Sequence, residues 1–126
     1  MRFLLDTRAF LWFVQEDPRL SAKARGFIED DDNERLLSPA SYWEITIKVG
    51  IGKLNLATPL ATFLADAIRA NRVLILPEHA VAVSLLPHHH RDPFGRMLVA
   101  QALVEDLPIL SADPALDAYN VPRLWA

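Results

Sequence analysis

The stretch Arg2-Phe3-Leu4-Leu5-Asp6-Thr7 places a short apolar run directly before a carboxylate. Two further runs behave alike: Leu36-Leu37-Ser38 leads into a helix-like segment with Glu44, and Ile109-Leu110-Ser111 is followed by Asp113. Ligands of open α/β sheets bind beyond the carboxyl ends of the strands, so acids at these positions predict one site assembled from distant parts of the chain. Several carboxylates in one crevice stay ionised cheaply only around a cation, which predicts a divalent metal and an anionic substrate.

Short apolar runs alternate with helix-like segments along the whole chain. We expect strands at residues 2–5, 36–37, 73–76, 108–110 and 121–124. Apolar spacing and capping residues predict helices that begin near Thr7, Ser21, Pro39, Thr58 and Pro77, and a further helix that carries Met97 and follows the histidine run. Parallel neighbours need crossover connections, so this alternation predicts an α/β fold with a parallel sheet covered on both faces. The length of 126 residues fits a single domain, residues 1–126.

Apolar residues beyond one small core are also present. Ala40, Trp43 and Ile47 are predicted to share one helix face, and Trp12, Trp43 and Trp125 are expected in the core or at an interface. Trp12, Phe13 and the apolar helix from Thr58 exceed what one small core covers, which predicts a two-fold homodimer with mainly apolar contacts.

The net charge of −3 argues against a domain that coats duplex DNA, because such binding draws its affinity from clustered Lys and Arg. A small basic patch near the acidic site could still position a phosphate backbone, and its members are Arg8, Lys48, Lys53, Arg91 and Arg96. The chain has no cysteine, and it shows neither a signal-peptide pattern nor an apolar stretch of membrane-spanning length. We therefore expect a soluble cytoplasmic protein without a membrane partner.

Six stretches, taken in order, resemble PIN-domain ribonucleases, and most closely the VapC-type toxins of bacterial toxin-antitoxin pairs. They are Leu4-Leu5-Asp6-Thr7, Ser38-Pro39-Ala40-Ser41-Tyr42-Trp43-Glu44-Ile45, Gly52-Lys53-Leu54, His90-Arg91-Asp92-Pro93-Phe94, Ala100-Gln101-Ala102 and Ser111-Ala112-Asp113. The resemblance covers almost the whole chain. It implies a PIN-like three-layer α/β/α sandwich, Mg²⁺ or Mn²⁺ held by acids, endonucleolytic RNA cleavage and a small antitoxin that covers the site.

Within this resemblance Asp6, Glu44 and Asp113 match metal-binding acids of the family. A further aspartate is usual where this chain has Gly95, so position 95 is a vacant ligand position. Asp92 lies one helical turn earlier and is a partial substitute, although capping a helix with Pro93 at its first position is its commoner role.

Two readings of Gly95 remain open on the sequence alone. With Asp92 as the cap, Gly95 is the third helical residue, where a carboxylate is favoured and Gly costs about 1 kcal/mol against Ala. Alternatively, Asp92-Pro93-Phe94-Gly95 forms a type I turn and the helix begins at Arg96. We favour the lost ligand, whether it is natural or a disarming change.

The mechanism implied needs no protein nucleophile. Asp6, Glu44 and Asp113 are expected to hold one or two ions that orient water, Thr7 and Ser111 to support the bound waters, and a carboxylate to accept a proton. The expected RNA contacts are Lys48, Arg91 and Arg96. Each acid also has an ordinary reading: Asp6 as a helix cap, Glu44 as a partner of Lys48, and Asp113 as a turn residue.

Two alternatives to an active nuclease stay open. One is a weakened PIN domain that chiefly binds an antitoxin. The other is a metal-dependent phosphatase-like domain, which is disfavoured because Arg8 stands where an Asp-x-Asp motif would need its second acid. The histidines at 88–90 lack the tetrahedral partner set of a zinc site and are predicted to form a polar loop.

Overall fold

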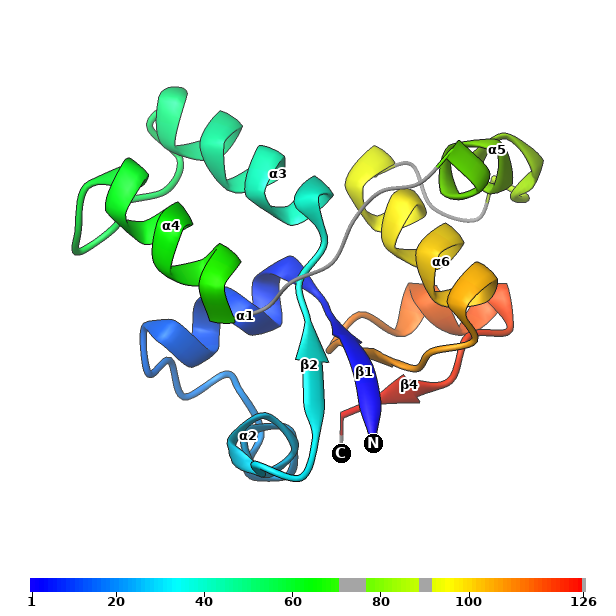
Figure 1. The fold of residues 1–126 in the computed structure, drawn as a ribbon, viewed down its shortest axis with the longest axis horizontal. Helices are drawn as coiled ribbons and strands as arrows, with labels where there is room; N and C mark the ends of the chain where they lie inside the picture. The colour runs from blue at the N-terminus through cyan, green and yellow to red at the C-terminus, as the bar shows by residue number, and fades with distance from the viewer. Residues whose placement is uncertain (71–76, 89–91, 126) are drawn as a thin grey trace.

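The computed structural model describes residues 1–70, 77–88 and 92–125, and within them four parallel strands form one sheet (Figure 1). The strands are β1 (Arg2–Leu5), β2 (Glu34–Leu36), β3 (Ile109–Leu110) and β4 (Arg123–Leu124), in the order β2-β1-β3-β4. The parallel sheet expected from the sequence is confirmed. The expected strand at 73–76 lies outside the described residues.

Helices connect these strands, and all but the last, a 3₁₀ helix, lie near the places that the sequence indicated. They are α1 (Thr7–Val14), α2 (Ala22–Glu29), α3 (Pro39–Gly50), α4 (Leu60–Ala70), α5 (Pro77–Leu85), α6 (Pro93–Glu105) and the 3₁₀ helix η1 (Pro114–Tyr119). The local chemistry explains several starts. The Ser21 hydroxyl accepts a hydrogen bond from the Ala24 amide, and the Ser38 hydroxyl accepts one from the Ala40 amide, so both residues cap their helices.

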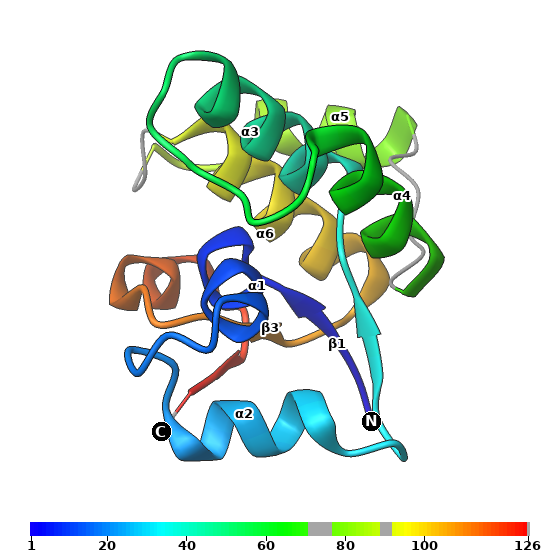
Figure 2. The ribbon, with the colours of Figure 1, turned by 90° about the vertical axis from the view of Figure 1, so that its left-hand side faces the viewer.

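Helices cover both faces of the sheet, because neighbouring residues of each strand point to opposite sides. Phe3 and Leu5 pack with α1, α2, α3 and α4 in one core, whereas Leu4 packs with α6 and η1 in a second core. Figure 1 shows α1 to α4 on one side of the sheet and α5 and α6 on the other, and Figure 2 shows α2 alongside the end of the sheet away from α3 and α6. The three-layer α/β/α sandwich is therefore confirmed.

The predicted apolar face of α3 is wrong. This helix buries Ala40, Ser41, Glu44 and Ile45, whereas Trp43 is 65% exposed and Ile47 is 38% exposed. Helix α3 is rotated so that Glu44 faces inward, and Trp43 instead packs edge-on against Phe94 of α6, with ring centroids 5.5 Å apart. Trp43 is thus not a core residue. Trp12 and Trp125 are partly buried, and their ring centroids lie 5.9 Å apart.

The strand order creates the crevice in which a site is expected. The chain moves from β1 to β2 on one side and later returns to β3 on the other side of β1, so connections diverge at β1 and β3. The Asp6 amide donates to the Leu110 carbonyl at 3.0 Å, and the Ser111 amide donates to the Leu124 carbonyl at 3.1 Å. These bonds fix the segments that carry Asp6 and Asp113 at the same carboxyl edge of the sheet.

Candidate active site

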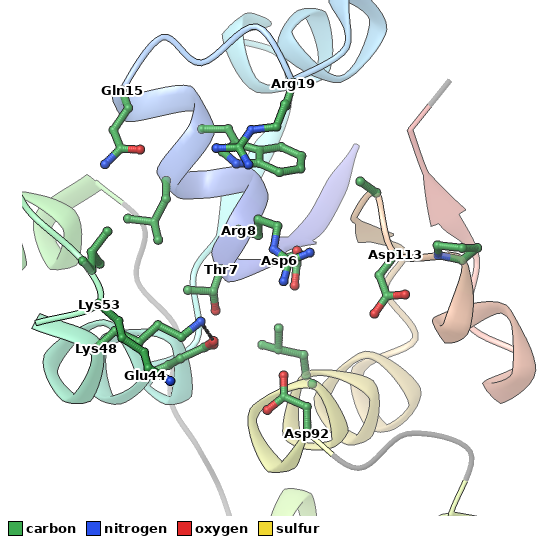
Figure 3. Close-up of a pocket in the computed structure, with 17 residues that line it drawn as sticks. Asp6, Thr7, Arg8, Gln15, Arg19, Glu44, Lys48, Lys53, Asp92 and Asp113 are labelled. Carbon is green, nitrogen blue, oxygen red and sulfur yellow. Dashed lines mark hydrogen bonds and ion pairs between the residues drawn. The ribbon is translucent and has the colours of Figure 1, made fainter. Parts of the chain in front are cut away.

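A pocket of about 500 Å³ opens at this carboxyl edge (Figure 3). Its walls include one acid from each of four separate segments, namely Asp6, Glu44, Asp92 and Asp113, together with Gly95. The prediction that Asp6, Glu44 and Asp113 meet in one pocket is confirmed. Their role as metal ligands stays a prediction.

Asp6 follows the last residue of β1 and lies at the centre of this acidic group (Figure 3). Burial raises the pKa of its carboxyl to about 6, and the charges of Glu44 and, more weakly, Asp113 act in the same direction. Arg8 and the Ala9 amide oppose this rise in pKa without cancelling it. The site thus keeps negative charges close together at a net energetic cost, which a bound cation would relieve.

Glu44 is supplied by the inward face of α3, and its carboxylate lies 2.7 Å from the Lys48 ammonium. The expected i, i+4 ion pair between Glu44 and Lys48 is therefore confirmed. Both residues nevertheless line the pocket, and the Glu44 side chain is only 10% exposed. The ion pair fixes the Glu44 side chain at the pocket wall and places the Lys48 ammonium beside it.

Asp92 and Asp113 both precede helices and cap them. Asp92 accepts from the Phe94 amide at 3.0 Å, and Asp113 accepts from the Ala115 amide at 3.0 Å. Both residues therefore cap helices, and the capping hydrogen bonds orient each carboxyl group at the pocket.

Gly95 is the third residue of α6, since the helix begins at Pro93 with Asp92 as its cap. The alternative in which a type I turn delays the helix to Arg96 is wrong. Position 95 belongs to the first turn of α6 and to the wall of the acidic pocket, and a carboxylate in that turn would interact favourably with the helix dipole.

The basic residues expected near the site separate into three groups. Arg8, Lys48 and Lys53 line the pocket. Arg91 lies outside the described residues, as do histidines 89 and 90. Arg96 is buried at 8% exposure, and its guanidinium donates to the carbonyl oxygens of Pro87 at 2.9 Å and Val83 at 3.0 Å. The structure therefore gives Arg96 a place in the core and not on the pocket, and we remove it from the expected RNA contacts.

The two hydroxyls expected beside the metal have protein partners. Thr7 donates to Ser41 at 2.7 Å, and the Ser111 hydroxyl accepts from the Asp113 amide at 3.0 Å. The first bond joins α1 to α3, and the second orients the segment that carries Asp113. Both hydroxyls thus hold the walls on which the acids stand.

Among the polar and aromatic side chains of the pocket, three were not expected from the sequence, namely Trp12, Gln15 and Arg19. A usable signal existed for two of them, because Arg8, Trp12 and Gln15 lie three or four residues apart and share one face of the helix after Asp6. Arg19 follows the end of that helix, and the sequence alone gave no reason to select it.

The donors around this pocket suit a hard divalent cation, since all four acids offer oxygen atoms. Among the side chains that the structure describes, no group of three or more Asp, Glu or His residues is already arranged to hold an ion. Gly95 lines the pocket without a side chain of its own, and its interpretation as a lost ligand position stays a prediction.

The comparisons with known proteins agree with this geometry. Residues 3–122 match the PIN domain family. The chain is a member of that family. It is 30% identical over 122 residues to "Ribonuclease VapC22" of Mycobacterium tuberculosis, which covers 95% of this chain and 93% of the relative. It is also 43% identical over 56 residues to "Ribonuclease VapC16" of the same organism, over 41% of this chain and 40% of that relative.

Solved structures support the PIN fold independently. A TM-score of 0.73 at 10% identity, with full coverage of both chains, relates the PIN domain to VapBC2 from Rickettsia felis bound to a promoter DNA fragment. VapBC-1 from nontypeable Haemophilus influenzae gives a TM-score of 0.67 at 12% identity, covering 98% of this chain and 97% of that one. The resemblance to VapC-type PIN domains is confirmed. In the described part of the chain, no helix has the length and apolar character needed to span a bilayer.

Proposed function

We propose that this PIN domain is the toxin of a toxin-antitoxin pair, a Mg²⁺- or Mn²⁺-dependent endoribonuclease whose activity is weakened by Gly95. Similarity to two ribonucleases, over 95% and 41% of the chain, supports the substrate class. The four acids around one pocket at the carboxyl edge of the sheet support hydrolysis that depends on a divalent ion, and this convergence is the observation that carries the proposal.

Asp6, Glu44 and Asp113 are the residues that would hold the ion, with Asp92 at the neighbouring edge. A divalent ion in such a site orients and activates water and neutralises charge on the scissile phosphate. One of these carboxylates would accept the proton that the activated water releases. Lys48 and Arg8 lie on the pocket wall, where they position the RNA backbone.

Gly95 weakens this site because it removes an oxygen donor from the wall at the start of α6. Mg²⁺ is bound through few carboxylates and keeps several waters, so loss of one ligand lowers affinity and misplaces the ion. Asp92 cannot replace it fully, since its carboxyl also accepts from the Phe94 amide.

Cleavage of a fluorescent RNA tests this function on three proteins: the unmodified chain, Gly95→Asp, and Gly95→Asp combined with Asp6→Asn. We expect weak cleavage by the first, EDTA-sensitive cleavage by the second at least about 10-fold faster, and none by the third. Equal EDTA-sensitive rates for the first two would show that position 95 is not a ligand position. Absence of cleavage by all three would overturn the nuclease proposal.

A PIN domain that acts mainly by binding its antitoxin is the second candidate, and Gly95 is the observation that favours it. The solved neighbours are VapBC structures, which supports a small antitoxin as partner. Co-purification with the product of an adjacent small gene, together with inactive Gly95→Asp protein, would select this alternative. The family assignment leaves the phosphatase-like alternative without support.

A homodimer is part of the proposal, supported by the exposed apolar side chains of α3, among them Trp43 and Ile47, which are 65% and 38% exposed. Sedimentation at micromolar concentration should show a species of twice the chain mass. A monomer at all concentrations tested would contradict this part.

A further inference from the structure

The pocket continues well beyond the acids, along the length of α1. Arg8, Trp12 and Gln15 follow one another on the pocket wall, and at 1.5 Å per residue the chain from Asp6 to Gln15 spans about 13 Å of helix. The pocket therefore has two ends. We call the group of four acids the acidic end, and Trp12, Gln15 and Arg19 the aromatic end. Figure 3 shows Gln15 and Arg19 at the opposite side of the pocket from Glu44 and Asp92.

Arg19 is held in place at the aromatic end although it is exposed. Its guanidinium carbon lies 5.0 Å from the centroid of the Trp12 ring. Its Nη2 atom lies 2.7 Å from one carboxylate oxygen of Asp17, and its Nε lies 3.1 Å from the other. The side chain is still 67% exposed. A planar cation is thus fixed in two ways and presented at the pocket.

This arrangement suits an unpaired nucleobase. Bases of single-stranded RNA stack on guanidinium planes and aromatic rings, and a surface that is ordered before binding loses little entropy when it binds. Asp17 neutralises the charge of Arg19 locally, so the guanidinium offers a stacking plane more than a free charge.

The charges along the pocket indicate where phosphates would lie. The acidic end repels phosphate unless a cation is bound, so affinity for an RNA backbone has to come from basic residues. Within residues 1–70, 77–88 and 92–125, neither Arg8 nor Lys53 lies within ion-pair distance of a carboxylate. Both line the pocket, so both are available to phosphates.

We propose that the aromatic end is a nucleotide subsite, in which the base of an unpaired RNA nucleotide stacks on the Arg19 guanidinium, which itself lies over the Trp12 ring, while Arg8 and Lys53 bind the phosphates that lead to the acidic end. This inference rests on the proposed ribonuclease function and names how the pocket holds the nucleotides that flank the scissile phosphate. The subsite itself acts without a metal.

Arg25 provides a matched control. Its guanidinium carbon lies 5.6 Å from the centroid of the Phe13 ring and it pairs with Glu29 at 3.4 Å, so it repeats the arrangement of Arg19. It does not line the pocket. Arg25→Ala therefore removes an arginine of the same charge and kind without touching the subsite.

The experiment measures binding of a fluorescein-labelled single-stranded RNA 12-mer by anisotropy, in EDTA and low salt, with the full chain and its variants. We expect Arg19→Ala to weaken binding about 5- to 10-fold and Arg25→Ala by less than about 2-fold. Arg19→Lys keeps the charge and loses the plane, so it should behave like Arg19→Ala. Inorganic polyphosphate, which has no bases, should bind equally to the unmodified chain and Arg19→Ala.

Several outcomes would overturn the subsite. It would be overturned if Arg19→Ala and Arg25→Ala lost equal RNA affinity, or if Arg19→Lys kept the full affinity of the unmodified chain. It would also be overturned if the unmodified chain did not bind RNA. Because the assay contains EDTA and measures no cleavage, a chain that binds RNA as expected but never cleaves it would refute the nuclease function and leave the subsite standing. Thermal unfolding of each variant shows that affinity, and not folding, has changed.

Discussion

The acidic end of the pocket and the corner between α5 and α6 both hold charged side chains away from solvent, but they treat these charges in opposite ways. At the corner, Arg96 donates to carbonyl oxygens of Val83, Leu86 and Pro87, and a ring nitrogen of the buried His79 lies 2.8 Å from a Glu105 oxygen. At the acidic end, burial and the charges of Glu44 and Asp113 raise the pKa of Asp6. The difference indicates that the corner serves stability, whereas the acidic end bears an electrostatic cost that a bound cation would lower.

The largest expected change in stability follows removal of the Arg96 guanidinium, which is hydrogen-bonded at the corner between α5 and α6. Arg96→Met leaves the carbonyls at the end of α5 without their donors, and we expect about 3 kcal/mol less stability. Urea unfolding measures this change. Arg96→Lys should recover only part of it, because an ammonium cannot reproduce the planar set of donors. If Arg96→Met lowered the free energy of unfolding by less than about 1 kcal/mol, the buried charge at the corner would not be stabilising, and the contrast with the acidic end would fail.

A smaller and opposite effect is expected at the acidic end. The pKa of Asp6 is raised from 3.8 to about 6 in the folded state, so the unfolded chain binds fewer protons between these pH values. Stability from this group is therefore lost as the pH rises from about 4 to 6. Asp6→Asn removes the cost, and at pH 7 we expect it to be more stable by about 2 kcal/mol in the absence of divalent ions.

The measurement for Asp6 is thermal unfolding of both proteins from pH 4 to pH 7.5 in EDTA. The difference in unfolding temperature between the two proteins reports Asp6 alone. Other groups with shifted pKa values contribute equally to both proteins; they include Asp17 and Asp117, whose pKa is lowered by hydrogen bonds from Arg19 and Arg123. The two curves should meet near pH 4 and separate above pH 5. If the unfolding temperatures of the two proteins changed in parallel with pH, the pKa of Asp6 would not be raised in the folded protein.

The smallest effect sharpens the comparison between two arginines. Arg19 is 67% exposed and pairs with Asp17 at the surface, so Arg19→Ala should change stability by less than about 0.5 kcal/mol. Urea unfolding beside Arg96→Met checks this. A loss as large as that of Arg96→Met would show that Arg19 is a structural residue, like the corner arginine.

The fold was readable from the sequence because its main signals are local. Short apolar runs such as Phe3 to Leu5 can bury both faces only between two layers, and Ser21 and Asp92 mark helix starts by capping. The meeting of Asp6, Glu44 and Asp113 also followed, because the carboxyl ends of parallel strands share one edge.

What the sequence could not supply depends on the rotation of helices and on long-range partners. The apolar spacing of α3 favoured Trp43 as a core residue, but the buried face is centred on Glu44 and Ile45. Arg96 follows the vacant position 95 directly and looked like a substrate contact, yet its side chain turns toward the carbonyls of α5. Arg19 lies beyond the end of α1, and its contacts with Trp12 and Asp17 place it at the pocket, so no helical periodicity could predict its position.

The central claim is that the acidic end is a cation site from which one carboxylate is missing at position 95. Calorimetric titration with Mn²⁺ tests it most directly, because it needs neither RNA nor cleavage. Gly95→Asn is the matched control, since it adds a side chain of the same size without the charge. We predict that Gly95→Asp binds Mn²⁺ at least about 10-fold more tightly than both the unmodified chain and Gly95→Asn. Equal affinities in all three proteins would contradict the claim.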